Sequence, residues 1–259
     1  MRWFETAPLS LIGITFLAML LAGVELGYRG HSWLRHAERD ADARHGGPDL
    51  LLSAVLGLLA LLLGFTFSLA LNRFEARRDL VLQEANAIGT IWLRAQLLEE
   101  PNRTAMLGLL RQYVDARLAW SEVDPSVAEL APTTALQAKL WTVTGAAIRG
   151  DSSHQLSRAV MEAMNGSFDL ASARAAARAA HIPGRVLGIL LLYAVLSMVL
   201  LGYILAANGR PHRVATGLLL VLLTLALVVI LDLDRPRSGA IQVSQQPLED
   251  LRASLQQAP

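Results

Sequence analysis

A long uncharged segment that runs directly into a charged one constrains this chain most. Residues 50–71 contain no charged side chain, and a bilayer core of about 30 Å needs about 20 apolar helical residues to cross it. The next seven residues, 72–78, read Asn-Arg-Phe-Glu-Ala-Arg-Arg and contain no helix breaker. The run that follows to Leu98 lacks proline and is rich in Ala, Leu, Glu and Arg, which favours helix. We therefore predict one helix that crosses a membrane and continues into water.

Three more segments without charge predict further spans. With them, the predicted fold is all-α, with transmembrane helices at about 8–27, 50–71, 186–207 and 214–231. Hydrophobic residues make up 53% of the chain and charged ones 17%, whereas soluble domains usually carry more charge. The first segment has an alternative interpretation as a signal peptide, because Arg2 precedes an apolar stretch that ends in small residues. Its continuation into Glu25 and Tyr28 is more typical of a helix that reaches the membrane interface, and we predict a retained span.

Four spans place both termini, the central segment 72–185 and the tail 232–259 on one side of the membrane. Arginines are more numerous near the span ends on that side, nine against six, and cytoplasmic loops tend to carry the excess of basic residues. We therefore predict that the termini and the central segment are cytoplasmic. The nine are Arg2, Arg73, Arg77, Arg78, Arg174, Arg178, Arg185, Arg235 and Arg237, and the six are Arg29, Arg35, Arg39, Arg44, Arg210 and Arg213.

The central segment 72–185 is predicted to form a cytoplasmic bundle of about four helices. Turn-forming residues interrupt it at 101–102, 124–125, 150–153 and 183–184. Between these breaks, apolar residues recur at helical spacing, so that each helix has an apolar face to bury. Examples are Leu107, Leu110, Val114 and Leu118.

No pattern typical of an enzyme occurs in the chain. His31, His36 and His45 lie close together, but their spacing does not match a helical histidine pair, and no carboxylate completes a zinc site. Nucleophile-elbow, phosphate-loop and dinucleotide-binding patterns are absent from the sequence. The net charge of +1 gives no basic face for a nucleic acid. We predict a protein without a catalytic residue and without a nucleic-acid partner.

The second span and its extension carry a stripe of small and polar residues. At 100° per residue, one helix face collects Ser53, Gly57, Leu61, Gly64, Ser68, Asn72, Glu75, Asp79 and Asn86. One interpretation is helix packing, since small residues allow a neighbouring helix to approach. The other is a pore lined by this helix from each subunit. Leu61 and Phe65 would form an apolar neck in that pore, with the polar Ser68 and Asn72 below it. Glu75 and Asp79 would then form cytoplasmic rings of carboxylates that attract cations.

Several elements of the sequence resemble a known family. Phe74-Glu75-Ala76-Arg77 resembles the aromatic-Glu-Ala-Arg element at which the second helix of bacterial bestrophin channels enters the cytoplasm. The chain as a whole is similar to bacterial membrane proteins of unknown function that are classed as bestrophin-like. Four segments carry this similarity: residues 63–68 (LGFTFS), 84–90 (EANAIGT), 231–237 (LDLDRPR) and 243–248 (VSQQPL).

The resemblance implies a homopentamer in the bacterial inner membrane, with an axial pore along the second helix and ion conduction that calcium sometimes gates. The chain departs from the family pattern in two places. Arg73 replaces the first of two aromatics, and an alignment anchored on residues 74–77 puts Leu56, Ala60 and Gly64 at the neck. An alignment anchored on residues 63–65 instead makes Leu61 and Phe65 the neck, and we adopt that register.

Asp232 and Asp234 are the nearest equivalent of the acidic calcium clasp of some bestrophins. Calcium takes six to eight oxygen ligands, so two carboxylates would need backbone oxygens, a neighbouring subunit, or Glu249 and Asp250. More often, such a pair caps charge at the membrane surface or bridges to Arg235 and Arg237, and contacts between subunits are a further role for it. No metal site is therefore predicted from these residues, and calcium is the one cofactor that the resemblance leaves open.

The predicted function is an oligomeric, bestrophin-like ion channel with a preference for cations, whose partners are the lipid bilayer, inorganic ions and further copies of the chain. The alternative is a membrane-anchored interaction or signalling module that does not conduct.

Overall fold

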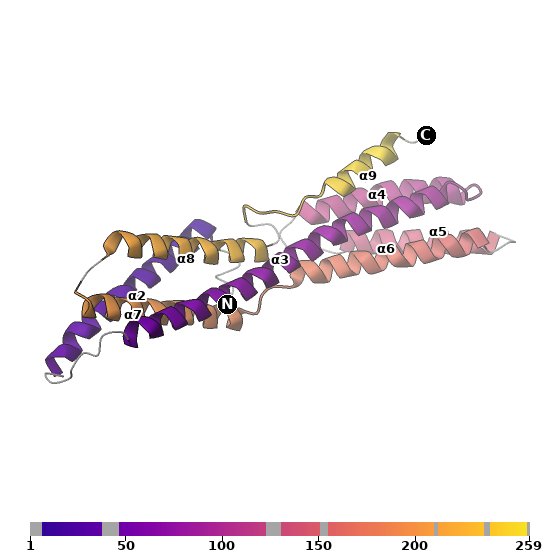
Figure 1. Cartoon of the computed structure of the whole chain (residues 1–259). Helices are drawn as coiled ribbons and strands as arrows, with labels where there is room; N and C mark the ends of the chain where they lie inside the picture. The colour runs from indigo at the N-terminus through magenta and orange to yellow at the C-terminus, as the bar shows by residue number, and fades with distance from the viewer. Residues whose placement is uncertain are drawn as a thin grey trace. The chain divides into compact units, whose positions relative to one another are not determined.

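The computed structural model describes residues 7–37, 47–122, 131–150, 155–209, 212–235 and 239–257, and the regular structure in these ranges is helical. The all-α prediction is therefore confirmed. Figure 1 shows the helices, whose bounds are α2 Leu9–Ala37, α3 Gly47–Ala95, α4 Asn102–Glu122, α5 Ala131–Gly150, α6 Gln155–Ala179, α7 Gly184–Ala207, α8 Arg213–Asp234 and α9 Gln246–Gln257.

The chain divides into two compact units. The first comprises Met1–Arg73 and His181–Gln242, and the second Phe74–Ala180 and Val243–Pro259. Helix α3 contributes to both, because it continues without interruption through Arg73 and Phe74. The predicted tail 232–259 is divided between the units, since its first part belongs to the first unit and α9 to the second.

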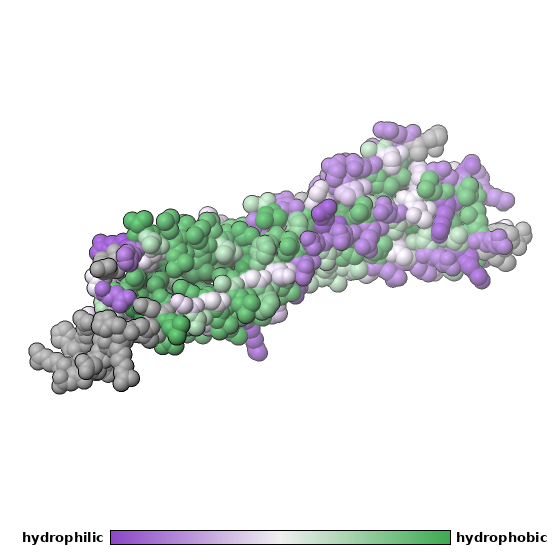
Figure 2. All heavy atoms as spheres, viewed as in Figure 1, coloured by the Kyte–Doolittle hydropathy of each residue, from purple (hydrophilic) through white to green (hydrophobic). Residues whose placement is uncertain are grey.

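The first unit contains four helices that are long and apolar enough to cross a membrane: α2, the first part of α3, α7 and α8. A buried cluster that includes Ile12, Leu59, Met198 and Leu227 joins them. The hydroxyl of Tyr193 on α7 also donates to the carbonyl oxygen of Val55 on α3, at 3.3 Å. Figure 2 shows the broad hydrophobic surface that these helices expose. These features identify the chain as a membrane protein.

Helices α2 and α7 are in backbone contact at glycines. A Cβ atom added to Gly27 would collide with the carbonyl oxygen of Val199, and one added to Gly202 would collide with that of Val24. Because lipid tails are as apolar as leucine, helices in a membrane associate mainly through such close packing. The two glycines therefore hold α2 against α7.

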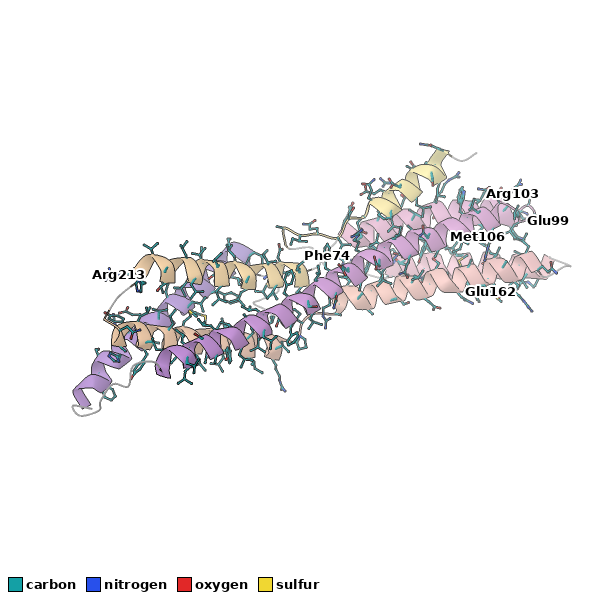
Figure 3. All side chains as sticks on the ribbon, in the orientation of Figure 1. Phe74, Glu99, Arg103, Met106, Glu162 and Arg213 are labelled. Atoms are coloured by element: carbon teal, nitrogen blue, oxygen red, sulfur yellow. The ribbon has the colours of Figure 1, made fainter. Side chains whose placement is uncertain are left out.

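The second unit has its own hydrophobic core. Ile88 of α3, Met106 of α4, Leu140 of α5, Met164 of α6 and Leu248 of α9 are all fully buried in it. Met106 is labelled in Figure 3. In water, each such side chain stabilises the fold by about 1.5–3 kcal/mol.

The helix ends agree in part with the predicted breaks. Helix α4 begins at Asn102 and α7 at Gly184, as expected from Pro101 and Pro183, whereas the predicted breaks at 124–125 and 151–153 lie outside the described residues. The carboxylate of Glu100 accepts hydrogen bonds from the Thr104 amide and hydroxyl. These bonds lower the pKa of Glu100 and stabilise the first turn of α4.

Candidate permeation helix

Helix α3 has 49 residues and is therefore about 73 Å long, more than twice the thickness of a bilayer core. Within the first unit, the four residues predicted to line a pore, Leu61, Phe65, Ser68 and Asn72, are all exposed. Leu61 is 52% exposed and Phe65 65%. The buried residues of the same stretch, Leu59, Thr66 and Ala70, lie on the other side of the helix. The predicted pore face thus lies within the part of the helix that this chain leaves uncovered, which also includes Leu58, Phe67 and Leu69.

The glycines of this face do not pack against the chain. A Cβ atom added to Gly57 or Gly64 would meet no atom of a described residue within 4 Å. Packing between helices of one chain, the first interpretation of the stripe, therefore does not account for these two glycines. Close helix packing occurs instead at Gly27 on α2 and Gly202 on α7, and neither glycine belongs to the second span.

In the second unit, Glu75 and Asp79 are exposed, and neither forms an ion pair with another described residue. The buried residues of this part of α3, among them Arg77, Val81 and Ile88, lie about 180° away around the helix. Both carboxylates are consequently free to interact with solvent or ions.

Arg77, the last residue of the Phe-Glu-Ala-Arg element, is buried and binds the end of α6. Its Nε donates to the carbonyl oxygen of Ala177 at 3.1 Å, and its Nη2 donates to that of Ala180 at 2.6 Å. The last carbonyls of a helix lack partners within the helix, and a cation stabilises them. The arginine thus anchors α3, and this contact fixes which way Glu75 and Asp79 point.

Glu84 is the centre of a buried ion cluster in the second unit. Its carboxylate, which is fully buried, accepts from Nε of Arg117 and from Nη1 of Arg174, each at 2.5 Å. Arg174 also donates to the side-chain oxygen of Gln245. Glu84 opens the element 84–90 and Gln245 lies in the element 243–248, so this cluster gives two of the motif segments a structural role. Such a cluster fixes the orientation of α3 relative to α4 and α6.

Three arginines surround the indole of Trp120. The guanidinium carbons of Arg117, Arg174 and Arg178 lie 4.4, 5.3 and 4.5 Å from the ring centroid, within the range of cation–π attraction. Burial lowers the pKa of Arg174, and the carboxylate of Glu84 opposes that shift. The indole supplements the single carboxylate, which alone does not balance three cations.

Asp232 and Asp234 are buried at the end of α8 and bind backbone amides. Asp232 accepts from the amides of Ala240 and Ile241 at 2.8 and 3.3 Å. Asp234 accepts from the amide of Ile182 at 2.9 Å, and its Oδ2 lies 3.5 Å from Nδ1 of His181. The pair therefore holds together the segments that flank α7 and α8. Arg235 donates to the carbonyl oxygen of Ala7, and Arg237 lies outside the described residues.

Within the described ranges, no group of three or more His, Asp or Glu side chains is placed to hold a metal ion. Calcium binding at Asp232 and Asp234 remains a prediction. It would require both carboxylates to exchange the amide donors described above for the ion.

The buried ion cluster could not be recognised in the sequence. Arg117 and Arg174 lie 33 and 90 residues from Glu84, so only the fold brings them together. The one available signal was that Glu84 shares its helix face with the apolar residues Val81, Ile88 and Ile91.

Comparisons with known proteins agree with this architecture. A family model described as "Bestrophin-like domain" matches residues 18–248. Among solved structures, a mutant of a bacterial bestrophin homologue from Klebsiella pneumoniae is similar with a TM-score of 0.66 and 14% identity, over 94% of this chain and 97% of that one. A second mutant of the homologue gives a TM-score of 0.63 and 16% identity, over 93% and 99% of the two chains. A structure described as a membrane protein gives 0.66 and 14%, over 95% and 96%. A search of curated proteins finds no match.

Proposed function

Because the chain belongs to the bestrophin-like family, we propose that it forms an oligomeric ion channel of the bacterial inner membrane, with one copy of α3 from each subunit around the pore. One observation carries this proposal. The face of α3 that holds Leu61, Phe65, Ser68 and Asn72 is uncovered in the chain, whereas the opposite face is buried.

The polar residues of the uncovered face favour a position in a pore and not against lipid. Ser68 lies inside the span 50–71 and Asn72 directly after it, and a polar group such as a hydroxyl that faces hydrocarbon without a partner costs about 2–7 kcal/mol. Water in a pore satisfies such groups. Gly57 and Gly64 would allow copies of α3 to approach one another near the pore axis.

The path so formed has three zones. Leu61 and Phe65 form an apolar neck that can close by dewetting, and Ser68 and Asn72 form a polar zone beyond it. Glu75 and Asp79 form carboxylate rings at the cytoplasmic end. With the pentamer that the family resemblance implies, each ring carries up to five negative charges, which concentrate cations.

Reversal potentials test this assignment. Channels reconstituted from the full chain are recorded in a salt gradient, before and after the double substitution Glu75→Gln and Asp79→Asn. Loss of both rings should move the reversal potential away from the cation equilibrium potential. The matched control, Glu99→Gln with Asp115→Asn, neutralises two exposed carboxylates of the same unit and should leave the potential unchanged.

An unchanged potential after loss of the rings would overturn the cation preference and leave the pore itself standing. Absence of any current in wild-type protein of confirmed oligomeric mass would overturn the channel. That result would favour the non-conducting membrane-anchored module.

A further inference from the structure

A cavity of about 290 Å³ lies in the first unit, between the later part of α2 and the start of α8. Toward the middle of the spans, Leu21 on α2 and Leu220 on α8 make its lining apolar. Toward the helix ends, Tyr28, Thr216 and Arg213 make the lining polar. The lining therefore changes from apolar to polar along the helices, as a membrane lipid does from its acyl chains to its headgroup.

The cavity lies at the membrane interface, because α8 changes there from polar to apolar. His212 and Arg213 precede an uncharged run of the helix, and both are exposed. Figure 3 labels Arg213 at the start of α8, and Figure 2 shows hydrophilic residues beside the apolar surface at this end of the spans. A phosphate group of a lipid would lie at this level. Tyrosine is also typical of it, and Tyr28 is 43% exposed.

The charge of the polar part of the lining favours an anion. Among the described residues of the lining, Glu25 is the one acidic residue, and its carboxylate is paired with Nε of Arg29 at 2.7 Å. Arg213 forms no ion pair with a described residue. Together Glu25, Arg29 and Arg213 carry a net charge of +1, and His212 adds to it when it is protonated.

We propose that this cavity binds an anionic phospholipid, with Arg213 on the phosphate, Tyr28 and Thr216 beside the headgroup, and the upper acyl chain against Leu21 and Leu220. A neutral or zwitterionic lipid would fill the apolar part equally well, but would leave the excess positive charge unbalanced. The proposal concerns a surface away from α3 and does not depend on conduction.

Native mass spectrometry of the full-length chain tests the site. Purified protein is incubated with equal amounts of phosphatidylglycerol and phosphatidylcholine that have the same acyl chains. We expect the wild-type protein to retain at least about five times as much phosphatidylglycerol as phosphatidylcholine. Since a charge-assisted hydrogen bond to phosphate contributes enough for about a tenfold change in affinity, Arg213→Gln should lower that retention about tenfold. The control Arg185→Gln removes an exposed arginine at the other end of the spans and should retain as much as wild type.

A second variant tests the cavity rather than the charge. Gly217 lines it, and a Cβ atom there would meet no described atom within 4 Å, so Gly217→Leu can enter the space without a backbone collision. It should lower the retention of both lipids with no change in oligomeric mass or melting temperature. Equal retention of the two lipids by wild type, full retention by Arg213→Gln or Gly217→Leu, or an equal loss in Arg185→Gln would each overturn the proposal. Because lipid retention is measured without current, a failure here is distinct from a failure of the channel.

Discussion

At the scale of single residues, the stability of the second unit depends on the fully buried carboxylate of Glu84. Glu84 accepts from two arginines at once, and one of them, Arg174, also donates to the side-chain oxygen of Gln245. Removing one partner of a buried ion pair destabilises a protein more than replacing the whole pair by apolar residues, because the remaining charge stays buried without compensation.

Glu84→Gln should therefore destabilise the protein by about 3–5 kcal/mol, the usual cost of breaking a buried pair. The fully buried Arg117 would lose its only carboxylate partner among the described residues. Thermal unfolding of detergent-purified protein measures the effect. Glu99→Gln changes the same groups at an exposed position of the same unit and should shift the melting temperature little. Equal shifts in the two variants would mean that the buried cluster contributes no special stability.

At the scale of helices, the sequence predicts those features that depend only on the local pattern of apolar and polar residues. The four spans, the continuation of α3 beyond the membrane and the exposed face with Ser68 and Glu75 all follow from local pattern. Contacts between distant segments could not be predicted in this way. Asp232, the nearest equivalent of the calcium clasp of some bestrophins, binds the amides of Ala240 and Ile241, a contact that depends on how the chain turns after α8.

Alanine substitutions of glycines test the close packing of α2 against α7. Gly202→Ala places a methyl group against the carbonyl of Val24, and because backbone cannot move aside cheaply, we expect a loss of at least about 1–3 kcal/mol. Gly188→Ala adds the same methyl group on α7 where no described atom lies within 4 Å, and should leave the melting temperature almost unchanged. A larger loss for Gly188→Ala than for Gly202→Ala would contradict the packing described for α2 and α7.

The natural absence of cysteine allows the pore face to be probed directly. Ser68→Cys and Leu222→Cys each introduce one thiol at an exposed position of a span, on α3 and α8 respectively. A charged, water-soluble thiol reagent should block current through Ser68→Cys, because that thiol faces water in the proposed pore. The same reagent should leave Leu222→Cys unaffected. Block of both variants or of neither would contradict the assignment of the α3 face.

At the scale of the whole molecule, the proposed channel requires several copies of the chain, because one α3 helix cannot enclose a path. The uncovered face of α3 supplies surface for such an assembly in both units. The number of subunits determines the width of the neck at Leu61 and Phe65, since adding a helix to the ring widens its centre.

Native mass spectrometry should therefore find a single assembly. Five chains of 28.0 kDa give about 140 kDa before bound lipid is added. A different closed ring would change the predicted stoichiometry but preserve an axial pore. A monomer or a closed dimer would exclude a pore around α3.

The two faces of α3 should respond differently to mutation. One side of the helix contacts its own chain through residues such as Val81 and Ile88, and the other side, with Ser68 and Asp79, is exposed in the described part of the chain. In a mutational scan, substitutions on the first side should deplete the protein from the cell, whereas those on the second should leave its abundance unchanged and alter only its activity. A selection for abundance and a selection for activity would thus recover two sets of positions that alternate along the same helix with its 3.6-residue period.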